Sequence, residues 1–281
     1  MNIQTAVQKA QLFLKEKNIK TPVLDSQILM SEAIKKEKEF IILNFDKEIS
    51  NKSLEHFNKL INQRAKGEPI AYLVKKKYFW KYQFTVNKDV LIPRPDTEVL
   101  IEEVLKLTKN KDSLNLLDVG VGSGCILISI LKDKKNFYGT GIDISKKSLD
   151  ICKINGENLG VISRLKLFKS DIDNFHFHKY DLIVTNPPYI EKSKLKYLER
   201  DVIGFEPKQA LDGGIEGITE ISKVIIRSSE LIKKNGFLIL EIGFNQKKKV
   251  KKILENKGFY IKKIIKDLSN NDRCIISMKI K

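Results

Sequence analysis

The sequence predicts an α/β protein in which a mostly parallel seven-stranded sheet, with helices on both faces, follows a small helical bundle. Residues 3–66 show helical periodicity and no strand signals. From about residue 95, apolar and β-branched segments alternate with segments of helix length, which is typical of a parallel sheet. The last two strand-like segments have no helix between them. We therefore expect an antiparallel hairpin at the carboxyl-terminal edge of the sheet.

The amino-terminal region, residues 1–75, is predicted to be a helical bundle. Apolar residues follow helical spacing in its first segment: Ile3, Val7, Ala10 and Leu14. Thr21 before Pro22 is typical of a helix start, and another helix is expected near Asn51. Residues 67–73 interrupt the helical pattern. The aromatic and β-branched segment 78–86 predicts a short hairpin or connector within a linker over residues 76–95.

The larger domain is predicted over residues 96–281. Its strands are expected at residues 114–120, 137–143, 165–171, 180–185, 237–243, 259–267 and 273–280. Its helices are expected at residues 123–132, 145–158, 217–234 and 246–257, the second of them capped by Ser145.

Composition restricts the classes of function. The chain carries 52 basic and 35 acidic residues, a net charge of +17, which would favour binding to phosphates. Only six of the basic residues are arginines and the lysines are spread along the chain, which favours compositional bias over a dedicated nucleic-acid surface. The three cysteines and three histidines form no paired pattern, so we expect no metal site and no disulfide. No apolar run could span a bilayer and the first residues form a charged amphipathic segment, so we expect a cytoplasmic protein.

A glycine-rich loop joins the first predicted strand of the sheet to a helix. Its sequence is Asp-Val-Gly-Val-Gly-Ser-Gly over residues 118–124. Such a loop lets a ligand approach the backbone at a helix amino terminus. The dinucleotide fingerprint would need a third glycine at position 125, where Cys125 stands. The candidate cofactor-binding residues here are Asp118, Gly120, Val121, Gly122, Ser123 and Gly124.

Three further residues follow later strands and suit an adenosine. Asp143 ends the next strand, where a carboxylate can hold a ribose diol. Asp171 and Ile172 follow the third strand, where they can bond to and cover an adenine ring, although a surface turn is an alternative. Asp118 would repel a pyrophosphate and attract a cation, although helix capping or loop bracing is its structural alternative. These residues suit S-adenosylmethionine, an adenosine that carries positive charge.

The segment Asn186-Pro187-Pro188-Tyr189 follows the fourth strand. Asn-Pro is common in turns, so a simple strand-ending turn is one interpretation. The alternative is chemical, because the prolines make the backbone stiff and extended. The Asn186 side chain and the Pro187 carbonyl would accept hydrogen bonds from a planar N–H group and stabilise its developing charge. Tyr189 would stack on that group, and the reaction would need neither a metal nor a covalent nucleophile. Ser123 is not expected to be a hydrolase nucleophile, because G-x-S-x-G is absent.

Several segments together resemble a known family. "LLDVGVGSG", "GIDIS" and "NPPYI" are similar to the motifs of class I S-adenosylmethionine-dependent methyltransferases that act on planar sp2 nitrogens. "IPRPDTE", "EPKQALDGG", "LEIGFNQ" and "DLSNNDR" narrow the resemblance to the HemK family, the peptide chain release factor glutamine methyltransferases. The resemblance covers about three quarters of the chain, and Ile242 departs from a histidine frequent in the family.

The resemblance implies a Rossmann-like fold and an EC 2.1.1 activity. The implied reaction transfers a methyl group from S-adenosylmethionine to the amide nitrogen of the glutamine in the GGQ motif of class I release factors, leaving S-adenosylhomocysteine. The glycine loop with Asp143, Asp171, Ile172 and Asn186 would line the cofactor. The segment from Asn186 to Tyr189 would hold the glutamine, and the bundle would dock the release factor.

Two alternatives remain open at this point. An adenine-N6 or guanine-N2 nucleic-acid methyltransferase would use similar chemistry and fits the positive charge. Flipping a base out of a duplex requires aromatic and arginine contacts, and the first 75 residues contain a single arginine, Arg64. A catalytically silent scaffold that binds the cofactor or RNA is the other alternative, and the intact motif from Asn186 to Tyr189 argues against it.

Overall fold

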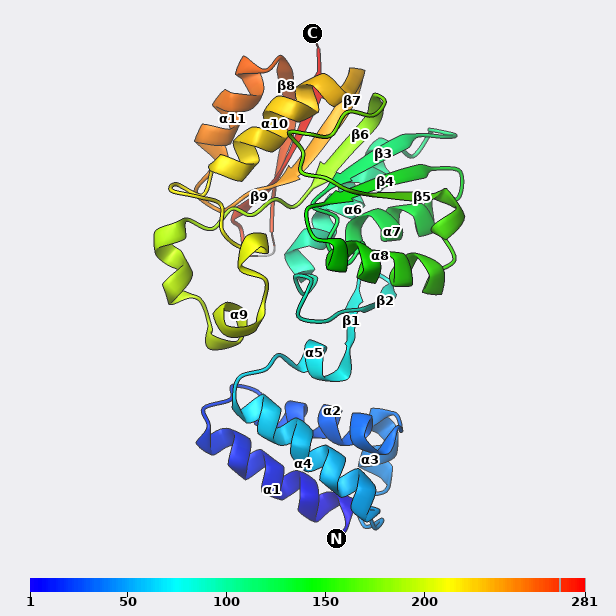
Figure 1. Cartoon of the computed structure of the whole chain (residues 1–281), viewed down its shortest axis with the longest axis vertical. Helices are drawn as coiled ribbons and strands as arrows, with labels where there is room; N and C mark the ends of the chain where they lie inside the picture. The colour runs from blue at the N-terminus through cyan, green and yellow to red at the C-terminus, as the bar shows by residue number, and fades with distance from the viewer. Residues whose placement is uncertain (268, 281) are drawn as a thin grey trace. The chain divides into compact units, whose positions relative to one another are not determined.

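The computed structural model describes residues 1–267 and 269–280 and divides the chain into two compact units (Figure 1). The first unit contains residues 1–76 and 199–205. The second contains residues 77–198 and the described residues from 206 onward. Residue 268, within the "DLSNNDR" motif, and residue 281 lie outside the described part of the chain. The sequence did not indicate that residues 199–205, inserted in the second unit, belong with the bundle.

The first unit is helical, as predicted. Its helices are α1 Ile3–Glu16, α2 Pro22–Ile34, α3 Lys38–Leu43, α4 Asn51–Ala65, α5 Ile70–Val74 and α9 Arg200–Phe205. Pro22 occupies the first turn of α2, and Ser50 caps α4 by accepting a hydrogen bond from Ser53 N. The buried Arg64 of α4 pairs with Asp25 of α2 at 2.7 Å. The apolar faces of α1, α2 and α4 meet in one core.

Residues 67–73 break the helical pattern, but they also contain part of a helix that the sequence did not predict. Gly67 has φ +100°, a conformation that few other residues adopt, and α5 begins three residues later. The predicted hairpin forms from β1 Lys76–Phe79 and β2 Tyr82–Thr85. Asp133 accepts hydrogen bonds from Trp80, Lys81 and Tyr82, and thereby anchors this hairpin to the end of helix α7 Cys125–Asp133.

The seven-stranded sheet has the order β5-β4-β3-β6-β7-β9-β8 (Figure 1). Its strands are β3 Asn115–Val119, β4 Tyr138–Asp143, β5 Leu165–Lys169, β6 Tyr180–Thr185, β7 Ile232–Glu241, β8 Phe259–Lys266 and β9 Asp272–Lys279. The pairs from β5 to β7 are parallel, whereas β9 pairs antiparallel with both β7 and β8. The predicted sheet and its terminal hairpin are therefore confirmed.

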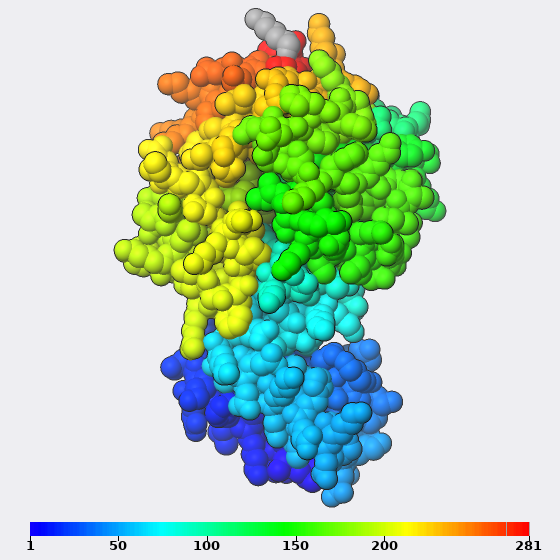
Figure 2. Space-filling model, viewed as in Figure 1, coloured from blue at the N-terminus to red at the C-terminus, as the bar shows by residue number. Residues whose placement is uncertain are grey.

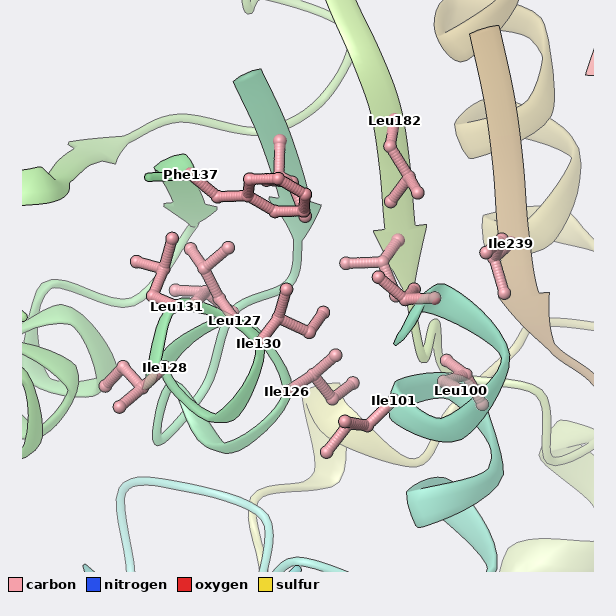
Figure 3. Packing of buried hydrophobic residues seen from close by; sticks show 14 of the residues in the cluster. Leu100, Ile101, Ile126, Leu127, Ile128, Ile130, Leu131, Phe137, Leu182 and Ile239 are labelled. Atoms are coloured by element: carbon pink, nitrogen blue, oxygen red, sulfur yellow. The ribbon is translucent and has the colours of Figure 1, made fainter. Parts of the chain in front are cut away.

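Helices cover both faces of this sheet. They are α6 Glu98–Leu107, α7 Cys125–Asp133, α8 Lys146–Asn158, α10 Thr219–Leu231 and α11 Lys247–Asn256. Adjacent residues of β3 point to opposite faces, so Leu116 joins a core with α6, α7 and α8, and Leu117 joins a core with α10 and α11. Figure 3 shows Leu100 of α6 beside the strands that carry Leu182 and Ile239. The sequence did not predict α6, which follows the "IPRPDTE" segment.

The parallel strands β3, β4, β5 and β6 all end at the same edge of the sheet, because parallel neighbours share one direction. In the space-filling view the surface of the second unit is hollowed between green and yellow segments of the chain (Figure 2). The predicted cofactor residues and the Asn186–Tyr189 motif follow these strand ends. Topology therefore gathers at one edge the residues that sequence reasoning singled out.

Candidate active site

The loop from β3 to α7 is held against β4 by its backbone. Gly120 N and Val121 N donate to Ile142 O at 2.9 and 3.0 Å. Gly120 and Gly122 have positive φ, and a Cβ atom on Gly120 would meet no atom within 4 Å. A Cβ atom on Gly124 would instead lie 2.5 Å from Ile128 Cδ1 and 2.6 Å from Cys152 Sγ. The first two glycines thus leave open space in front of the loop, and Gly124 lets α7 and α8 pack behind it.

Asp118 lies behind the glycine loop and is 1% exposed. Among the described residues, neither of its carboxylate oxygens has a hydrogen-bond partner at normal geometry, although the nearby backbone N–H of Leu127 partly lowers its pKa. Burial, with a smaller contribution from the nearby Asp143 charge, raises the pKa of Asp118 to about 8. A buried, unpartnered carboxyl group favours a cation in its neighbourhood, because a positive charge would offset the cost of ionising it.

Asp143 ends β4 with both carboxylate oxygens engaged. One accepts from Gly122 N at 3.0 Å and the other from Ser145 N at 2.8 Å. Burial nevertheless raises the pKa of Asp143. Each carboxylate oxygen has a second lone pair, so Asp143 can brace the loop and still accept from a diol.

The third predicted pair is placed differently. Asp171 is exposed and accepts hydrogen bonds from the backbone and side-chain nitrogens of Asn174, which lower its pKa. Ile172 is 7% exposed and packs into the core under α10. Their roles toward an adenine ring stay predictions, since Asp171 already braces a local turn.

The glycine loop is also tied to neighbouring elements on its inner side. Ser123 O accepts from Asn155 Nδ2 of α8 at 2.8 Å, and the same side chain bonds to both backbone groups of Thr85 in the hairpin. Val121 is buried against Gly141 of β4. These contacts brace the loop from its inner side. The open glycines, the braced Asp143 and the unpartnered Asp118 together fit a cationic adenosine.

The Asn186–Tyr189 segment is supported from two other parts of the chain. Asn186 Nδ2 donates to Thr97 Oγ at 3.2 Å, and Thr97 Oγ donates to Glu241 Oε2 at 2.7 Å. Thr97 and Glu241 are 2% and 1% exposed, and Pro187 is buried. No described residue donates a hydrogen bond to Asn186 Oδ1 or to Pro187 O. Both oxygens are therefore available as acceptors.

Tyr189 at the end of the motif is held by charged neighbours. Its hydroxyl lies 3.1 Å from Glu241 Oε1 and 3.4 Å from a guanidinium nitrogen of Arg273. Arg273 pairs with Asp267 at 2.9 Å and lies 6.0 Å from the centre of the Tyr189 ring. Burial and the Glu241 charge raise the pKa of Tyr189, and burial raises the pKa of Glu241 to about 7. The ring of Tyr189 is fixed by its hydroxyl end.

Gln246 ties three loops together beneath Tyr189. Its side-chain nitrogen donates to Tyr189 O at 2.8 Å and to Gly217 O at 2.9 Å, and its oxygen accepts from Gly243 N at 2.8 Å. A Cβ atom on Gly217 would lie 2.4 Å from Tyr189 O. A Cβ atom on Gly213 would lie 2.8 Å from Tyr189 Cα. The glycines allow these loops to approach closely.

Sequence reasoning missed the supporting residues Thr97, Glu241, Gln246 and Arg273 as parts of the site. All four lie in segments that carried the resemblance, 92–98, 240–246 and 267–273. The position of Glu241, a charged residue at the end of an apolar strand, was a further signal. Arg94 pairs with the buried Glu206, which also accepts from Ile92 N.

Among described residues, no group of three or more His, Cys, Asp or Glu side chains could hold a metal. None of the described helices is long and apolar enough to cross a membrane.

The order of strands and the glycine loop are those of the class I methyltransferase fold. The structure is similar to a ribosomal protein L11 methylase from Lactobacillus delbrueckii subsp. bulgaricus, with a TM-score of 0.51 at 19% identity over 73% of this chain and 90% of the other. It is also similar to a methyltransferase from Pyrococcus furiosus, with a TM-score of 0.52 at 16% identity over 70% and 89%. These similarities concern the fold alone.

Sequence comparison identifies the family. The family model described as "PrmC N-terminal domain" matches residues 5–74, and that described as "Methyltransferase small domain" matches residues 95–214. Release factor glutamine methyltransferases of Clostridium acetobutylicum and of Buchnera aphidicola are 37% and 34% identical to this chain over 99% of both partners. That of Caulobacter vibrioides is 33% identical over 95% of this chain and 92% of its own length. The chain belongs to the release factor glutamine methyltransferase family, as the resemblance predicted.

Proposed function

We propose that the chain transfers a methyl group from S-adenosylmethionine to the side-chain amide nitrogen of the glutamine in the GGQ motif of class I release factors. One observation carries the proposal. Asn186 Oδ1 and Pro187 O are two carbonyl acceptors with no described donor, on a stiff segment beside the glycine loop's strand. Two such acceptors match the two N–H bonds of a primary amide.

The chain's own residues would hold the cofactor as follows. Gly120, Gly122 and the backbone beside them leave room for the methionine part, and Asp118 favours its positive charge. Asp143 would accept from the ribose hydroxyls, while Asp171 and Ile172 would lie toward the adenine. S-adenosylmethionine supplies a methyl group on a sulfonium and would leave as the neutral thioether S-adenosylhomocysteine, as the carbon–sulfur bond breaks. The amide nitrogen would gain the methyl group and release one of its two protons.

The amide nitrogen is a weak nucleophile, because its lone pair is conjugated with the carbonyl group. Hydrogen bonds from its N–H groups to Asn186 and Pro187 would fix the direction of the nitrogen and stabilise the positive charge that it develops. The Tyr189 ring, held at its hydroxyl by Glu241 and Arg273, would stack on the planar amide. Catalysis by this site is therefore a matter of positioning and electrostatics.

The partner would be the release factor as a folded protein, in the cytoplasm. A helical bundle over residues 1–75 would provide its docking surface, and the methyltransferase domain over residues 96–281 would carry the chemistry. The family model that matches residues 5–74 and the full-length relatives support this division.

The test is transfer of radiolabelled methyl from S-adenosylmethionine to four acceptors side by side. They are purified release factor, its variant with alanine for the GGQ glutamine, duplex DNA and ribosomal RNA. Label on the intact release factor alone supports the proposal. Label on nucleic acid would overturn it and would mean that Asn186 to Tyr189 hold a base.

A further inference from the structure

We propose that Thr97 and Glu241 are positioning residues that fix the orientation of the Asn186 amide, so that its oxygen faces the substrate. This inference rests on the proposed function of Asn186. An asparagine side chain presents an oxygen on one side and an NH2 group on the other, and rotation by about 180° exchanges them. Only one orientation can accept a hydrogen bond from a substrate N–H. In the other orientation, the NH2 group of the asparagine would face the N–H group of the substrate, and two donors cannot form a hydrogen bond.

The direction of the hydrogen bonds follows from the number of protons available. A carboxylate can only accept, so Thr97 must use its single hydroxyl proton toward Glu241, at 2.7 Å. The hydroxyl oxygen then has only lone pairs left for its other neighbour. Asn186 must therefore offer its NH2 group to Thr97, at 3.2 Å, and its Oδ1 atom points away from Thr97. When it is ionised, Glu241 thus determines the orientation of Asn186 through one intervening hydroxyl.

Burial protects this arrangement from water. Thr97 is 2% exposed and Glu241 is 1% exposed, so solvent does not offer the hydroxyl an alternative acceptor. Thr97 ends the short helix Pro95–Thr97 that precedes α6, and α6 packs into the core through Leu100 and Ile101. The Thr97 hydroxyl is therefore delivered by a rigid element and not by a mobile loop.

Glu241 is connected by hydrogen bonds to both ends of the Asn186–Tyr189 segment. Its Oε2 atom controls Asn186 through Thr97, and its Oε1 atom accepts from the Tyr189 hydroxyl at 3.1 Å. Glu241 itself is the last residue of β7, which pairs with β6 immediately before the motif. One buried carboxylate thereby sets the hydrogen-bond acceptor and the aromatic ring that a planar amide would meet.

The experiment compares Thr97→Val with Thr97→Ser in the full chain. Valine keeps the size of threonine and removes the hydroxyl, whereas serine keeps the hydroxyl. We expect Thr97→Val to lower kcat on release factor by about 10- to 100-fold, the range for a misplaced catalytic group. The Kd for S-adenosylmethionine, measured by calorimetry, should change less than twofold. Thr97→Ser should retain at least a third of the wild-type kcat.

Thr108→Val is the matched control. Thr108 is also 2% exposed, and its hydroxyl donates to Val104 O at 2.7 Å, at the other end of α6. The kcat of the Thr108→Val variant should stay near that of the wild type. Glu241→Gln is the second variant, because the new NH2 group can donate to Thr97 and leave the Thr97 proton for Asn186 Oδ1. It should lower kcat while cofactor binding persists.

The outcomes separate the two proposals. If the wild type does not label release factor, the proposed function fails. If the wild type labels it and both Thr97→Val and Glu241→Gln keep their kcat, the positioning role is overturned. A parallel loss of kcat and cofactor affinity in Thr97→Val, not restored in Thr97→Ser, would also overturn it, because the residue would then serve only the fold.

Discussion

The hydroxyl of Tyr189 lies 3.1 Å from the carboxylate of Glu241, although the two residues are 52 positions apart in the sequence. Burial raises the pKa of both groups, that of Glu241 to about 7. The hydrogen bonds around a buried carboxyl group depend on its ionisation, because loss of its charge changes which neighbour donates and which accepts.

Activity should therefore fall on the acid side of neutrality. Protonation of Glu241 below pH 7 gives it a hydrogen to donate and removes its demand on the Thr97 proton. The groups that face Glu241 are Thr97 from the short helix, Tyr189 after β6 and Arg273 from β9. Its charge also interacts with that of Asp96 and with the buried thiols of Cys125 and Cys274. We expect a plot of kcat against pH to decline with an apparent pKa near 7, and we expect Glu241→Gln to lack that decline. An unchanged profile in the variant would assign the titration to another group.

The same group should affect the free energy of unfolding with a defined sign. Its pKa is about 7 in the folded protein and near 4.5 when unfolded, so the folded state binds the proton more tightly between these values. Its contribution to stability is then full below pH 4.5 and is lost as pH rises through 7. Urea unfolding at pH 5.5 and 8 should show a smaller loss of stability with rising pH in Glu241→Gln than in the wild type. Equal losses would contradict the assignment.

Gly217→Ala should damage the site beneath Tyr189. The new methyl carbon would lie 2.4 Å from Tyr189 O and 2.7 Å from Gln246 Nε2, so the loops that Gln246 joins must separate. We expect kcat to fall by about 100-fold, as for misplacement of a catalytic group by about 1 Å, with cofactor affinity largely kept. Gly160→Ala is the control, because Gly160 has φ +67° against +69° for Gly217 but open space around it. Equal effects of the two variants would show that backbone strain, and not the clash, is responsible.

Asp143→Ala should weaken cofactor binding. The change removes the acceptor for Gly122 N and Ser145 N together with the proposed ribose contact. Hydrogen bonds to a charged group contribute about 1.5–3 kcal/mol each, so Kd for S-adenosylmethionine should rise at least about 10-fold. Asp150→Ala, which removes only an exposed pair with Lys146, should leave Kd unchanged. Unchanged binding in Asp143→Ala would mean that the ribose is held elsewhere.

The positions of the strands along the chain and of most helices could be predicted because their patterns are local. Apolar runs and a serine cap at Ser145 are visible in a few residues of sequence, and the structure confirms them. The α6 helix was missed, since it follows two prolines within a segment read as motif. The sequence also did not show that residues 199–205 belong to the first unit, because a helix of six residues, such as α9, gives little periodicity.

The candidate site likewise contains residues that the sequence could indicate and residues that it could not. Gly120, Gly122 and Asn186 stand next to strand ends, where the topology of a parallel sheet fixes their position. Glu241 and Thr97 are different, because their importance depends on a contact across 144 positions. No local pattern in the sequence shows that a carboxylate at the end of a strand will accept a hydrogen bond from a threonine far from it in the chain. Only the folded chain brings these two side chains together.

Asn186→Ala should separate catalysis from cofactor binding. The variant removes the proposed acceptor for the substrate amide but leaves the glycine loop and its bond to Asp143 intact. We expect kcat to fall by about 100- to 1000-fold, as when one preorganised contact to developing charge is lost, while Kd for S-adenosylmethionine changes by less than about fivefold. Single-turnover methylation and calorimetry measure the two quantities, with the exposed Asn158→Ala at the end of α8 as a control. An equal loss of both quantities would place Asn186 at the cofactor and not at the reacting amide.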